Sequence, residues 1–311
     1  MSDAPGWFTR AIGTTPESHR IDVGGTSIHY LAWGERALPG IVLVHGGAAH
    51  AHWWGHIGPS FLPEYRVVAL DLSGHGDSDR REEYTLRAWT EEVAAVIDDA
   101  GFTSPPVVVG HSMGGFVTIA TAAWQADHIG GAVIIDSPVQ AEDPEVARAR
   151  RTDEFKKAKT YDDPDIPIAR FRTIPEQRHY LPYVKEHVAR NSLTVLNDGR
   201  WGWKFDPTIF VPRRAEPAQL LAEVTCRVAL LRCEYGLVTP DIGDYMYEQL
   251  GRVAPVIELP TAGHHPMLDV PLIRDRAEPR DRDFRIVVGL RFLELVGAPR
   301  SGDLGVLGLH G

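Results

Sequence analysis

One short stretch, residues 107–115, constrains the fold of this chain more than any other. It reads Val-Val-Val-Gly-His-Ser-Met-Gly-Gly. The three β-branched residues predict a short, fully buried strand that stops at Gly110. The apolar run that follows, residues 116–124, is long enough for a packed helix. The stretch therefore predicts a buried strand, a sharp turn around Ser112 and a helix.

The turn carries the pattern Gly-x-Ser-x-Gly, with Ser112 at its centre. Such a turn forces the serine into a strained backbone conformation and lifts its hydroxyl clear of the sheet edge. The flanking positions need glycine because a Cβ there would collide with the strand or the helix. The N–H groups that open the helix then point at the oxygen that becomes negative during acyl transfer. A chance glycine–serine turn is the alternative, but the setting between strand and helix favours a nucleophile.

Composition and charge narrow the class of protein. The chain has 311 residues, 43% of them hydrophobic and 24% charged, which suits one large globular domain or two small ones. The formal net charge of −10 argues against nucleic acid or an anionic membrane surface as a partner. No apolar run approaches the ~20 residues of a membrane span, and the first residues lack the features of a signal peptide. We therefore expect a small-molecule substrate as the partner.

The two cysteines, Cys226 and Cys233, bear on the location of the protein. If both lie on one strand, they are roughly 23 Å apart on opposite faces. A disulfide between them is then impossible. A reducing, cytoplasmic setting is the simpler interpretation.

Strand-like and helix-like segments alternate along most of the chain. The expected strands are a hairpin at 21–33 and residues 41–44, 65–70, 107–110, 129–135, 226–231 and 255–259. The expected helices are 85–100, with Thr85 as N-cap, and residues 116–124, 241–250 and 284–296. The charge-dense residues 274–283 precede the last helix and have no functional interpretation. The alternation predicts an α/β fold, with a mostly parallel sheet covered by helices on both faces.

The alternation breaks in residues 139–222. This segment holds fifteen Lys or Arg and thirteen Asp or Glu, so its net charge is +2, whereas the remainder carries −12. It is rich in aromatic residues and has no strand-like buried run, which favours an inserted unit. The expected organisation is a surface arm (1–20), a core (21–138 and 223–298), the insertion (139–222) and a flexible tail (299–311).

Four motifs together resemble those of the α/β-hydrolase family: residues 45–47 (His-Gly-Gly), 71–78, 110–114 and 263–264 (Gly-His). The resemblance covers most of residues 21–272. It implies the α/β-hydrolase fold, with a mostly parallel sheet of about eight strands and a helical lid inserted after the sixth strand. A serine in the turn, rather than the aspartate of the similar haloalkane dehalogenases and epoxide hydrolases, implies acyl transfer.

The resemblance also implies roles for single residues. Ser112 is the expected nucleophile, and His264, which follows a glycine after the last predicted strand of the sheet, is the expected general base. By position, the N–H groups of Gly47 and Met113 form the oxyanion hole, where each donor supplies about 2.7–4 kcal/mol to the transition state. A mere tight turn is the alternative for the glycine motif. Asp71 is expected to brace the loop near the site.

The acid of the triad is missing from its usual place. The loop after the seventh strand carries Gly236 where the family's aspartate normally stands. Asp136, just after the sixth strand, is our first choice, because parallel strands present site residues at their carboxyl ends. Certain similar zearalenone lactonases take their acid from this position. The alternatives are that Asp136 only binds loop amides, that a shifted loop brings Glu234 to the histidine, that Asp241 serves, or that there is no acid.

Other side chains expected around the pocket are His45, His111, Trp201, Trp203 and His265. His50, His52 and His56 also suggest a metal site. The pattern His-x-His-x-Asp-His would, however, need a carboxylate where Trp54 stands and a histidine at Gly55. We therefore expect neither a metal nor a cofactor.

The expected activity is hydrolysis of a carboxylic ester or lactone through an acyl-enzyme. Carbon–carbon bond hydrolysis and cofactor-free perhydrolysis use the same constellation and stay open as alternatives. A non-catalytic ligand-binding receptor on the same fold is the alternative of another class, and the glycine at position 236 is its main support.

Overall fold

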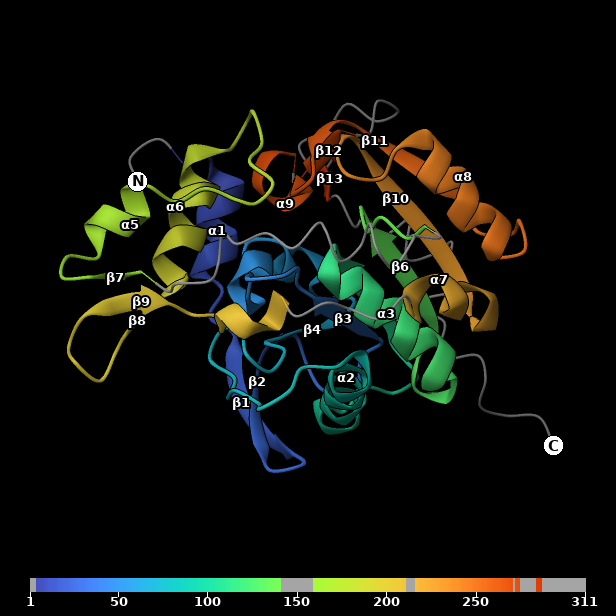
Figure 1. Ribbon diagram of the computed structural model, residues 1–311, viewed down its shortest axis with the longest axis horizontal. Helices are drawn as coiled ribbons and strands as arrows, with labels where there is room; N and C mark the ends of the chain where they lie inside the picture. Colours follow the sequence, from blue (N-terminus) through green and yellow to red (C-terminus); the bar gives the residue numbers. More distant parts are fainter. Residues whose placement is uncertain (1–3, 141–158, 211–215, 271, 275–283, 287–311) are drawn as a thin grey trace.

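Eight strands form one sheet through the centre of the computed structural model (Figure 1). The structure describes residues 4–140, 159–210, 216–270, 272–274 and 284–286. In sheet order the strands are β1 (Glu17–Val23), β2 (Thr26–Trp33), β4 (Arg66–Leu70), β3 (Gly40–Val44), β5 (Val107–His111), β6 (Gly131–Ile135), β10 (Arg227–Tyr235) and β11 (Val256–Gly263). β2 pairs antiparallel with β1 and β4, and the other neighbours run parallel. The predicted mostly parallel sheet of about eight strands is confirmed.

The central strands are buried on both faces. All residues of β3 are buried, and they alternate between two apolar clusters. Ile41 and Leu43 belong to the cluster on one face, and Val42 and Val44 to the cluster on the other. Continuous apolar runs of this kind are typical of parallel strands that helices cover on both sides.

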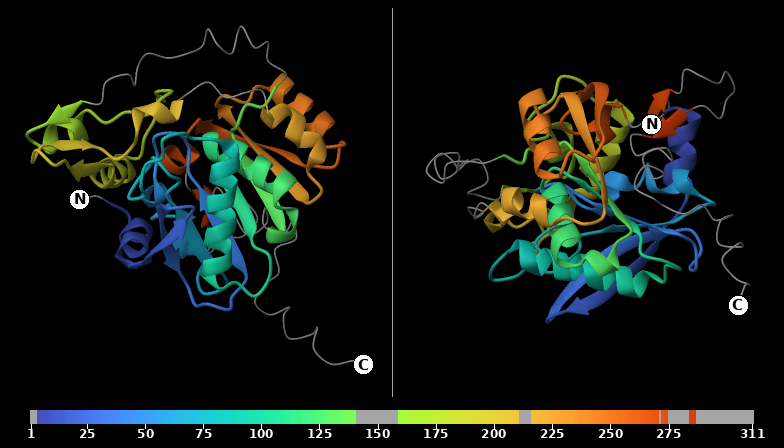
Figure 2. Two further views of the ribbon diagram at one scale, coloured as in Figure 1. Left: turned by 60° about the horizontal axis from the view of Figure 1, so that its bottom comes forward. Right: turned by 90° about the vertical axis from the view of Figure 1, so that its right-hand side faces the viewer.

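The helices divide between the two faces. On the side of Val42 lie α2 (Leu86–Ala100), α3 (Met113–Trp124), α7 (Glu216–Leu220) and α8 (Pro240–Gln249). On the other side lie α1 (Gly6–Gly13), α6 (Pro182–Asn191) and α9 (Pro266–Asp269). Figure 2 shows α2 and α3, in teal and green, side by side in its left view. Thr85 caps α2 as predicted, because its hydroxyl oxygen accepts the N–H of Ala88 at 3.1 Å.

Short 3₁₀ helices complete the connections: η1 (Ala51–Trp54), η2 (Gly58–Phe61), η3 (Ala126–His128), η5 (Pro207–Phe210) and η6 (Leu221–Glu223). None of the helices within the described ranges combines the length and the apolar character that crossing a lipid bilayer demands.

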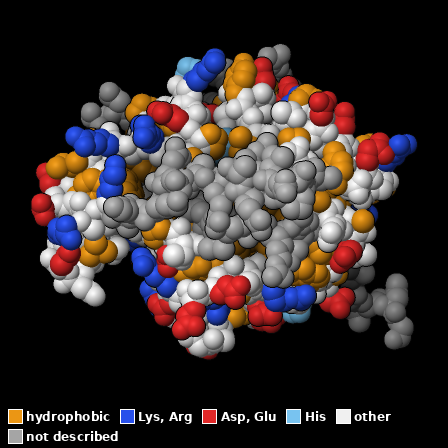
Figure 3. Space-filling view, in the orientation of Figure 1, with side chains coloured by type: hydrophobic (Ala, Val, Ile, Leu, Met, Phe, Trp, Pro, Cys, Tyr) orange, Lys and Arg blue, Asp and Glu red, His pale blue; other side chains and the backbone are white. Residues whose placement is uncertain are grey.

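The described part of the insertion after β6 is a mixed unit. It contains the helices α5 (Asp165–Ala169) and α6, and an antiparallel sheet of β7 (Thr160–Tyr161), β9 (Trp201–Trp203) and β8 (Leu193–Val195). The expected helical lid thus includes strands as well as helices in its described part. The unit lies at the left of Figure 1, beside α1. Figure 3 shows Lys and Arg side chains gathered on this left part of the surface, in line with the basic composition of the insertion.

The amino-terminal region also differs from the prediction. Residues 1–20 were expected to form a surface arm. They include α1, whose Phe8 is fully buried against the core, and the beginning of β1. A short helix with one buried aromatic residue leaves too few apolar positions for a periodic pattern to be recognised.

The carboxy-terminal region is described only in part. The expected helix at 284–296 begins instead with a strand, β13 (Phe284–Ile286), which pairs antiparallel with β12 (Leu272–Arg274). The charged residues 275–283 and the tail 299–311 lie outside the described residues. The division into core, insertion and tail stays a prediction.

Candidate active site

The carboxyl ends of the parallel strands meet at one edge of the sheet, and the predicted site residues follow them. The residues are His45 after β3, Asp71 after β4, Ser112 after β5, Asp136 after β6, Gly236 after β10 and His264 after β11. The register of β5 and β6 pairs His111 with Ile135, so the turn after each strand begins at the same level. This is the edge at which open α/β sheets bind their ligands.

Ser112 adopts the strained turn that its motif predicts. Its φ of +53° lies in a region that residues with a side chain rarely enter. A Cβ at Gly110 would lie 2.2 Å from the carbonyl oxygen of Gly114, and a Cβ at Gly114 would lie 2.4 Å from that of His45. Glycine at both positions therefore lets strand, turn and helix approach closely enough to raise the serine above the sheet edge.

Ser112, His264 and Asp136 form one hydrogen-bonded chain. The Ser112 oxygen lies 3.0 Å from Nε2 of His264, and Nδ1 of His264 lies 2.6 Å from Oδ2 of Asp136. A carboxylate only accepts, so Nδ1 carries the proton and the lone pair of Nε2 faces the serine hydroxyl. Asp136 is fully buried and His264 is 3% exposed. The arrangement can remove the serine proton as the oxygen attacks a carbonyl.

Backbone groups hold the Asp136 carboxylate from the loop after β10. Oδ1 accepts the N–H groups of Cys233 at 3.1 Å and Val238 at 3.2 Å, and Oδ2 accepts that of Leu237 at 2.7 Å. Burial raises the pKa of Asp136, but the hydrogen bond and charge of His264, together with these donors, hold the pKa below its ordinary value. The carboxylate is therefore ionised at neutral pH.

Gly236 is needed because Asp136 fills the space beside it. A Cβ at Gly236 would lie 2.2 Å from Oδ2 of Asp136. The competing acid, Glu234, is exposed and accepts the N–H of Thr261 at 2.7 Å through Oε2. The remaining candidate, Asp241, is exposed in the first turn of α8. Of the three carboxylates considered, the structure brings Asp136 to the histidine.

Two backbone donors lie beside the serine. Gly47 and Met113 line the same cavity as Ser112. Met113 is the first residue of α3, so its N–H has no acceptor within the helix and lies at the positive end of the helix dipole. Two such donors next to a nucleophile are what an oxyanion hole requires.

A cavity of about 140 Å³ opens at Ser112. Among the residues that line it are Gly46, Gly47, His111, Phe116, Ile174 and His265. The predicted pocket residues His111 and His265 are thus present. Phe116 and Ile174 were not predicted, because the sequence around a single apolar residue does not show whether that residue faces a cavity or the core. Ile174 is the contribution of the insertion.

Trp201 and Trp203 are not among the described residues that line this cavity, and their role in the pocket stays a prediction. Both lie on β9 of the insertion. The ring of Trp203 packs against Phe171 and Tyr161, with centroids 6.0 and 6.4 Å apart. Trp203 therefore packs against aromatic side chains of the insertion and against the edge of the core.

His45 is not among the described residues that line the cavity, and its ring braces the loops behind the site. Its Nδ1–H donates to the carbonyl oxygen of Gly46 at 2.7 Å, and its Nε2 accepts the N–H of Leu72 at 3.1 Å. Asp71 has the bracing role expected of it, since its carboxylate accepts the N–H of Ala51 at 2.6 Å.

The loop of His264 is tied to the insertion by Gln177, which the sequence did not single out. The side-chain oxygen of Gln177 accepts the N–H of His265 at 2.9 Å, and its nitrogen donates to Asp269 at 3.1 Å. The same oxygen of Asp269 accepts the N–H of Gly263 at 2.7 Å. No local motif marks Gln177, because His265 is 88 residues away in sequence.

Two groups of side chains in the described residues place three ligand atoms within 4.8 Å of one another. They are His29 with Asp71 and Asp77, and His111 with His264 and His265. The histidines at positions 50–56, considered as metal ligands from the sequence, belong to neither group. In the first group Asp71 is already bound to the His29 ring at 2.7 Å and to backbone N–H groups, which suits its bracing role.

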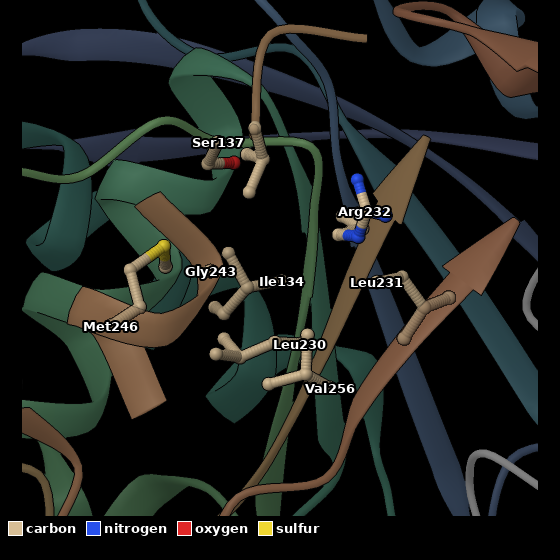
Figure 4. A pocket seen from close by; sticks show the side chains of 9 residues that line it. Ile134, Ser137, Leu230, Leu231, Arg232, Gly243, Met246 and Val256 are labelled. Atoms are coloured by element: carbon tan, nitrogen blue, oxygen red, sulfur yellow. The ribbon is translucent and has the colours of Figure 1, made fainter. Parts of the chain in front are cut away.

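A second cavity lies away from the serine, between β6, β10, β11 and α8 (Figure 4). Ile134, Leu230, Met246 and Val256 point into it. Its volume of about 10 Å³ is close to the least that one water molecule needs. It is a packing defect of the core and too small for a substrate.

Comparisons with known proteins agree with this fold. The model of the family described as "Alpha/beta hydrolase family" matches residues 41–274, more than half of the chain. The chain is 36% identical to epoxide hydrolase 4 of Mus musculus over 122 residues, which cover 38% of this chain and 34% of that protein. It is 30% identical to lipase LipV of Mycobacterium tuberculosis over 177 residues, which cover 57% of this chain and 66% of that protein. The chain thus spans about a third of the first relative and just under two thirds of the second.

Solved structures share the fold. The thioesterase domain from the curacin biosynthetic pathway superposes with a TM-score of 0.69 at 23% identity, covering 82% of this chain and 96% of that one. E-2-(acetamidomethylene)succinate hydrolase superposes with a TM-score of 0.70 at 20% identity, covering 82% and 95%. At these identities the likeness concerns the fold alone.

Proposed function

This chain belongs to the alpha/beta hydrolase family, and from that premise we propose that it is a serine hydrolase that cleaves a carboxylic ester or lactone through an acyl-enzyme. In this proposal Ser112 is the nucleophile, His264 the general base and Asp136 the acid. The supporting observation is the hydrogen-bonded chain of these three side chains, with the serine on a strained turn at a cavity.

The proposed reaction has two halves. His264 takes the hydroxyl proton while the Ser112 oxygen attacks the carbonyl carbon, and the ionised Asp136 stabilises the imidazolium that results. The N–H groups of Gly47 and Met113 stabilise the oxyanion. His264 then returns the proton to the leaving alcohol, which departs and leaves an acyl-serine. Water, activated by the same histidine, releases the acid and restores the serine.

Two features favour this reaction over its alternatives. A serine at position 112 supports acyl transfer over the alkyl-enzyme route of the similar hydrolases that carry aspartate there. The alternative of a non-catalytic receptor was based on the glycine at position 236, where an aspartate was expected. Because the carboxylate of Asp136 lies beside that glycine, the glycine no longer favours a receptor. The cavity of about 140 Å³ is small beside the roughly 300–1,000 Å³ of drug-sized pockets, which favours a short acyl group.

A covalent probe tests the proposal. A fluorophosphonate should label the native protein at one serine, and Ser112→Ala should abolish the labelling. The same variant should lose at least roughly 10³-fold in turnover, measured on aryl esters of graded acyl length and on lactones. Ser60→Ala, at an exposed serine, is the matched control. Labelling that persists in a folded Ser112→Ala protein would contradict the assignment.

A further inference from the structure

We propose that three histidines around Ser112 form an inhibitory site for a divalent transition metal ion such as Zn²⁺. The ring of His111 lies 4.9 Å from that of His264 and 5.2 Å from that of His265, and the last two are 4.5 Å apart, measured between centroids. One ligand nitrogen of each lies within 4.8 Å of the others, and all three residues are buried. Imidazole is the commonest protein ligand for such ions.

Hydrogen bonds fix which nitrogen of two of these rings can bind a metal. His264 donates its Nδ1–H to Asp136, so the lone pair lies on Nε2. His111 has its Nε2 2.7 Å from the carbonyl oxygen of His264, which can only accept, so the lone pair of His111 lies on Nδ1. Histidines that bind metals typically donate their second ring N–H to a carboxylate or a backbone carbonyl, as these two do.

Ring nitrogens of His265 and His111 lack a hydrogen bond of ordinary geometry within the described part of the chain. They are Nδ1 of His111 and both nitrogens of His265, whose ring lies close enough to the backbone of Ile174 and Pro175 for these groups to raise its pKa. Both histidines line the cavity at Ser112. Buried polar atoms are normally satisfied, so unsatisfied nitrogens on two residues that line one cavity point to a ligand.

The rings can reach the geometry that the ion requires. Zn–N distances of about 2.0–2.1 Å place tetrahedral ligand nitrogens about 3.3 Å apart, so the most distant of these atoms must approach one another. When its ring turns, His265 gives up only weak contacts with the backbone of Ile174 and Pro175. Gly46 leaves Nδ1 of His111 open, because a Cβ there would lie 3.0 Å from it. Three histidines with a fourth position for the Ser112 oxygen or water are a ligand set that Zn²⁺ accepts.

A bound ion would stop the proposed reaction. It would occupy the lone pair of Nε2 in His264, which must accept the proton of Ser112. Metal binding and proton transfer therefore exclude each other, and a chelator should restore activity. The inhibition rests on the proposed function, whereas the binding does not.

The experiment measures binding and inhibition separately. Zinc chloride is titrated by calorimetry into the metal-free native protein and into Ser112→Ala, and we expect one ion per chain in both. Ester hydrolysis by the native protein should fall over the same zinc concentrations and return with EDTA. His265→Gln should weaken zinc binding at least ~10-fold. His128→Gln, at a partly exposed histidine in η3, should leave the affinity unchanged.

Cobalt(II) gives a readout that needs no variant, because an ion held by several nitrogens in four-coordinate geometry absorbs strongly in visible light. Absence of this absorption in the native protein would overturn the proposal. So would an unchanged zinc affinity in folded His265→Gln and His111→Gln. Ester hydrolysis without zinc binding would reject the metal site and leave the proposed function. Zinc binding at these histidines in a protein without hydrolase activity would support the site and reject the function.

Discussion

The carboxylate of Asp136 and the loop after β10 are joined by several hydrogen bonds. The carboxylate comes from the end of β6, and the loop supplies the N–H groups of Cys233, Leu237 and Val238 that hold it. Because those donors point at Asp136, the loop must pass close to the carboxylate, which leaves room only for Gly236. The glycine at position 236 therefore accompanies the proposed acid at position 136.

The first prediction separates Asp136 from Glu234. Asp136→Asn should lower kcat on the order of 10⁴-fold, because an amide cannot stabilise the imidazolium or select its tautomer. Glu234→Gln should change kcat little, since its carboxylate binds the exposed backbone of Thr261. Steady-state kinetics on one activated ester decides between them. A collapse of turnover in Glu234→Gln alone would show that the acid is misassigned.

The second prediction concerns Gly236. A methyl group at this position would lie 2.2 Å from Oδ2 of Asp136, so Gly236→Ala should push the carboxylate away from His264. We expect a loss of roughly 1–3 kcal/mol in the free energy of unfolding and a fall in kcat. Urea unfolding and ester kinetics measure the two effects. Gly13→Ala is the control, because a Cβ there meets nothing within 4 Å. Equal effects of the two substitutions would mean that the loop yields freely.

Among the elements, the strand–turn–helix unit and the insertion differ in how far the sequence predicts them. The turn at Ser112 depends on neighbours within a few residues, so its residues predict it directly. The insertion depends on contacts between distant segments. An aromatic residue such as Trp203 is compatible with a pocket wall or with the packing of the insertion itself, and the sequence does not distinguish these two roles. The contact of Trp203 with Phe171 favours the second role.

The third prediction assigns selectivity to Ile174 rather than to Trp203. Ile174 lines the cavity at Ser112 and is 47% exposed, so Ile174→Ala should enlarge the pocket at little cost in stability. Its relative kcat/KM should shift toward esters with longer acyl chains. Trp203→Ala should instead lower the melting temperature, with a loss of roughly 1–3 kcal/mol. Kinetics on esters of graded length and thermal unfolding provide the comparison.

Comparing Ile174→Ala with Trp203→Ala gives this prediction a clear contrary outcome. If Trp203→Ala alters the ratio of rates among esters while Ile174→Ala does not, the insertion contributes to the site through β9 and the present assignment is wrong. If neither does, the insertion does not set selectivity through these residues, and the remaining lining residue of α3, Phe116, becomes the next position to vary.

Across the whole molecule, the alternation of apolar strands with amphipathic helices sufficed to predict the sheet. The rule that parallel strands end at one edge sufficed to predict that Ser112, Asp136 and His264 lie together. Features that depend on packing between distant segments were not predictable. The contact of His111 with the backbone of His264 joins residues 153 apart. No periodic pattern in the sequence predicts such a contact, because no local motif at either residue marks it.

Buried histidines such as His56 and His75 contribute to how the stability of the whole molecule responds to acid. Burial lowers the pKa of His56 and of His75 to about 3, and both are 1% exposed. In the unfolded chain a histidine titrates near 6.5. The folded pKa is the lower one, so the folded state favours the neutral ring. This stabilisation is complete above pH 6.5 and is lost as the pH falls from 6.5 toward 3, because the unfolded state then binds more protons.

The fourth prediction follows from this loss of stability as the pH falls. Between pH 8 and pH 5 each of the two histidines should remove about 2 kcal/mol from the free energy of unfolding, a large share of the roughly 5–15 kcal/mol of a typical domain. Urea midpoints measured across this range should therefore fall steeply. His56→Gln retains a donor for the carbonyl of Met267, which Nε2 of His56 contacts at 2.8 Å, and it cannot titrate. It should flatten the pH dependence by about 2 kcal/mol. A midpoint that stays constant from pH 8 to pH 5 would mean that these rings can be protonated without unfolding the chain, through water that reaches them.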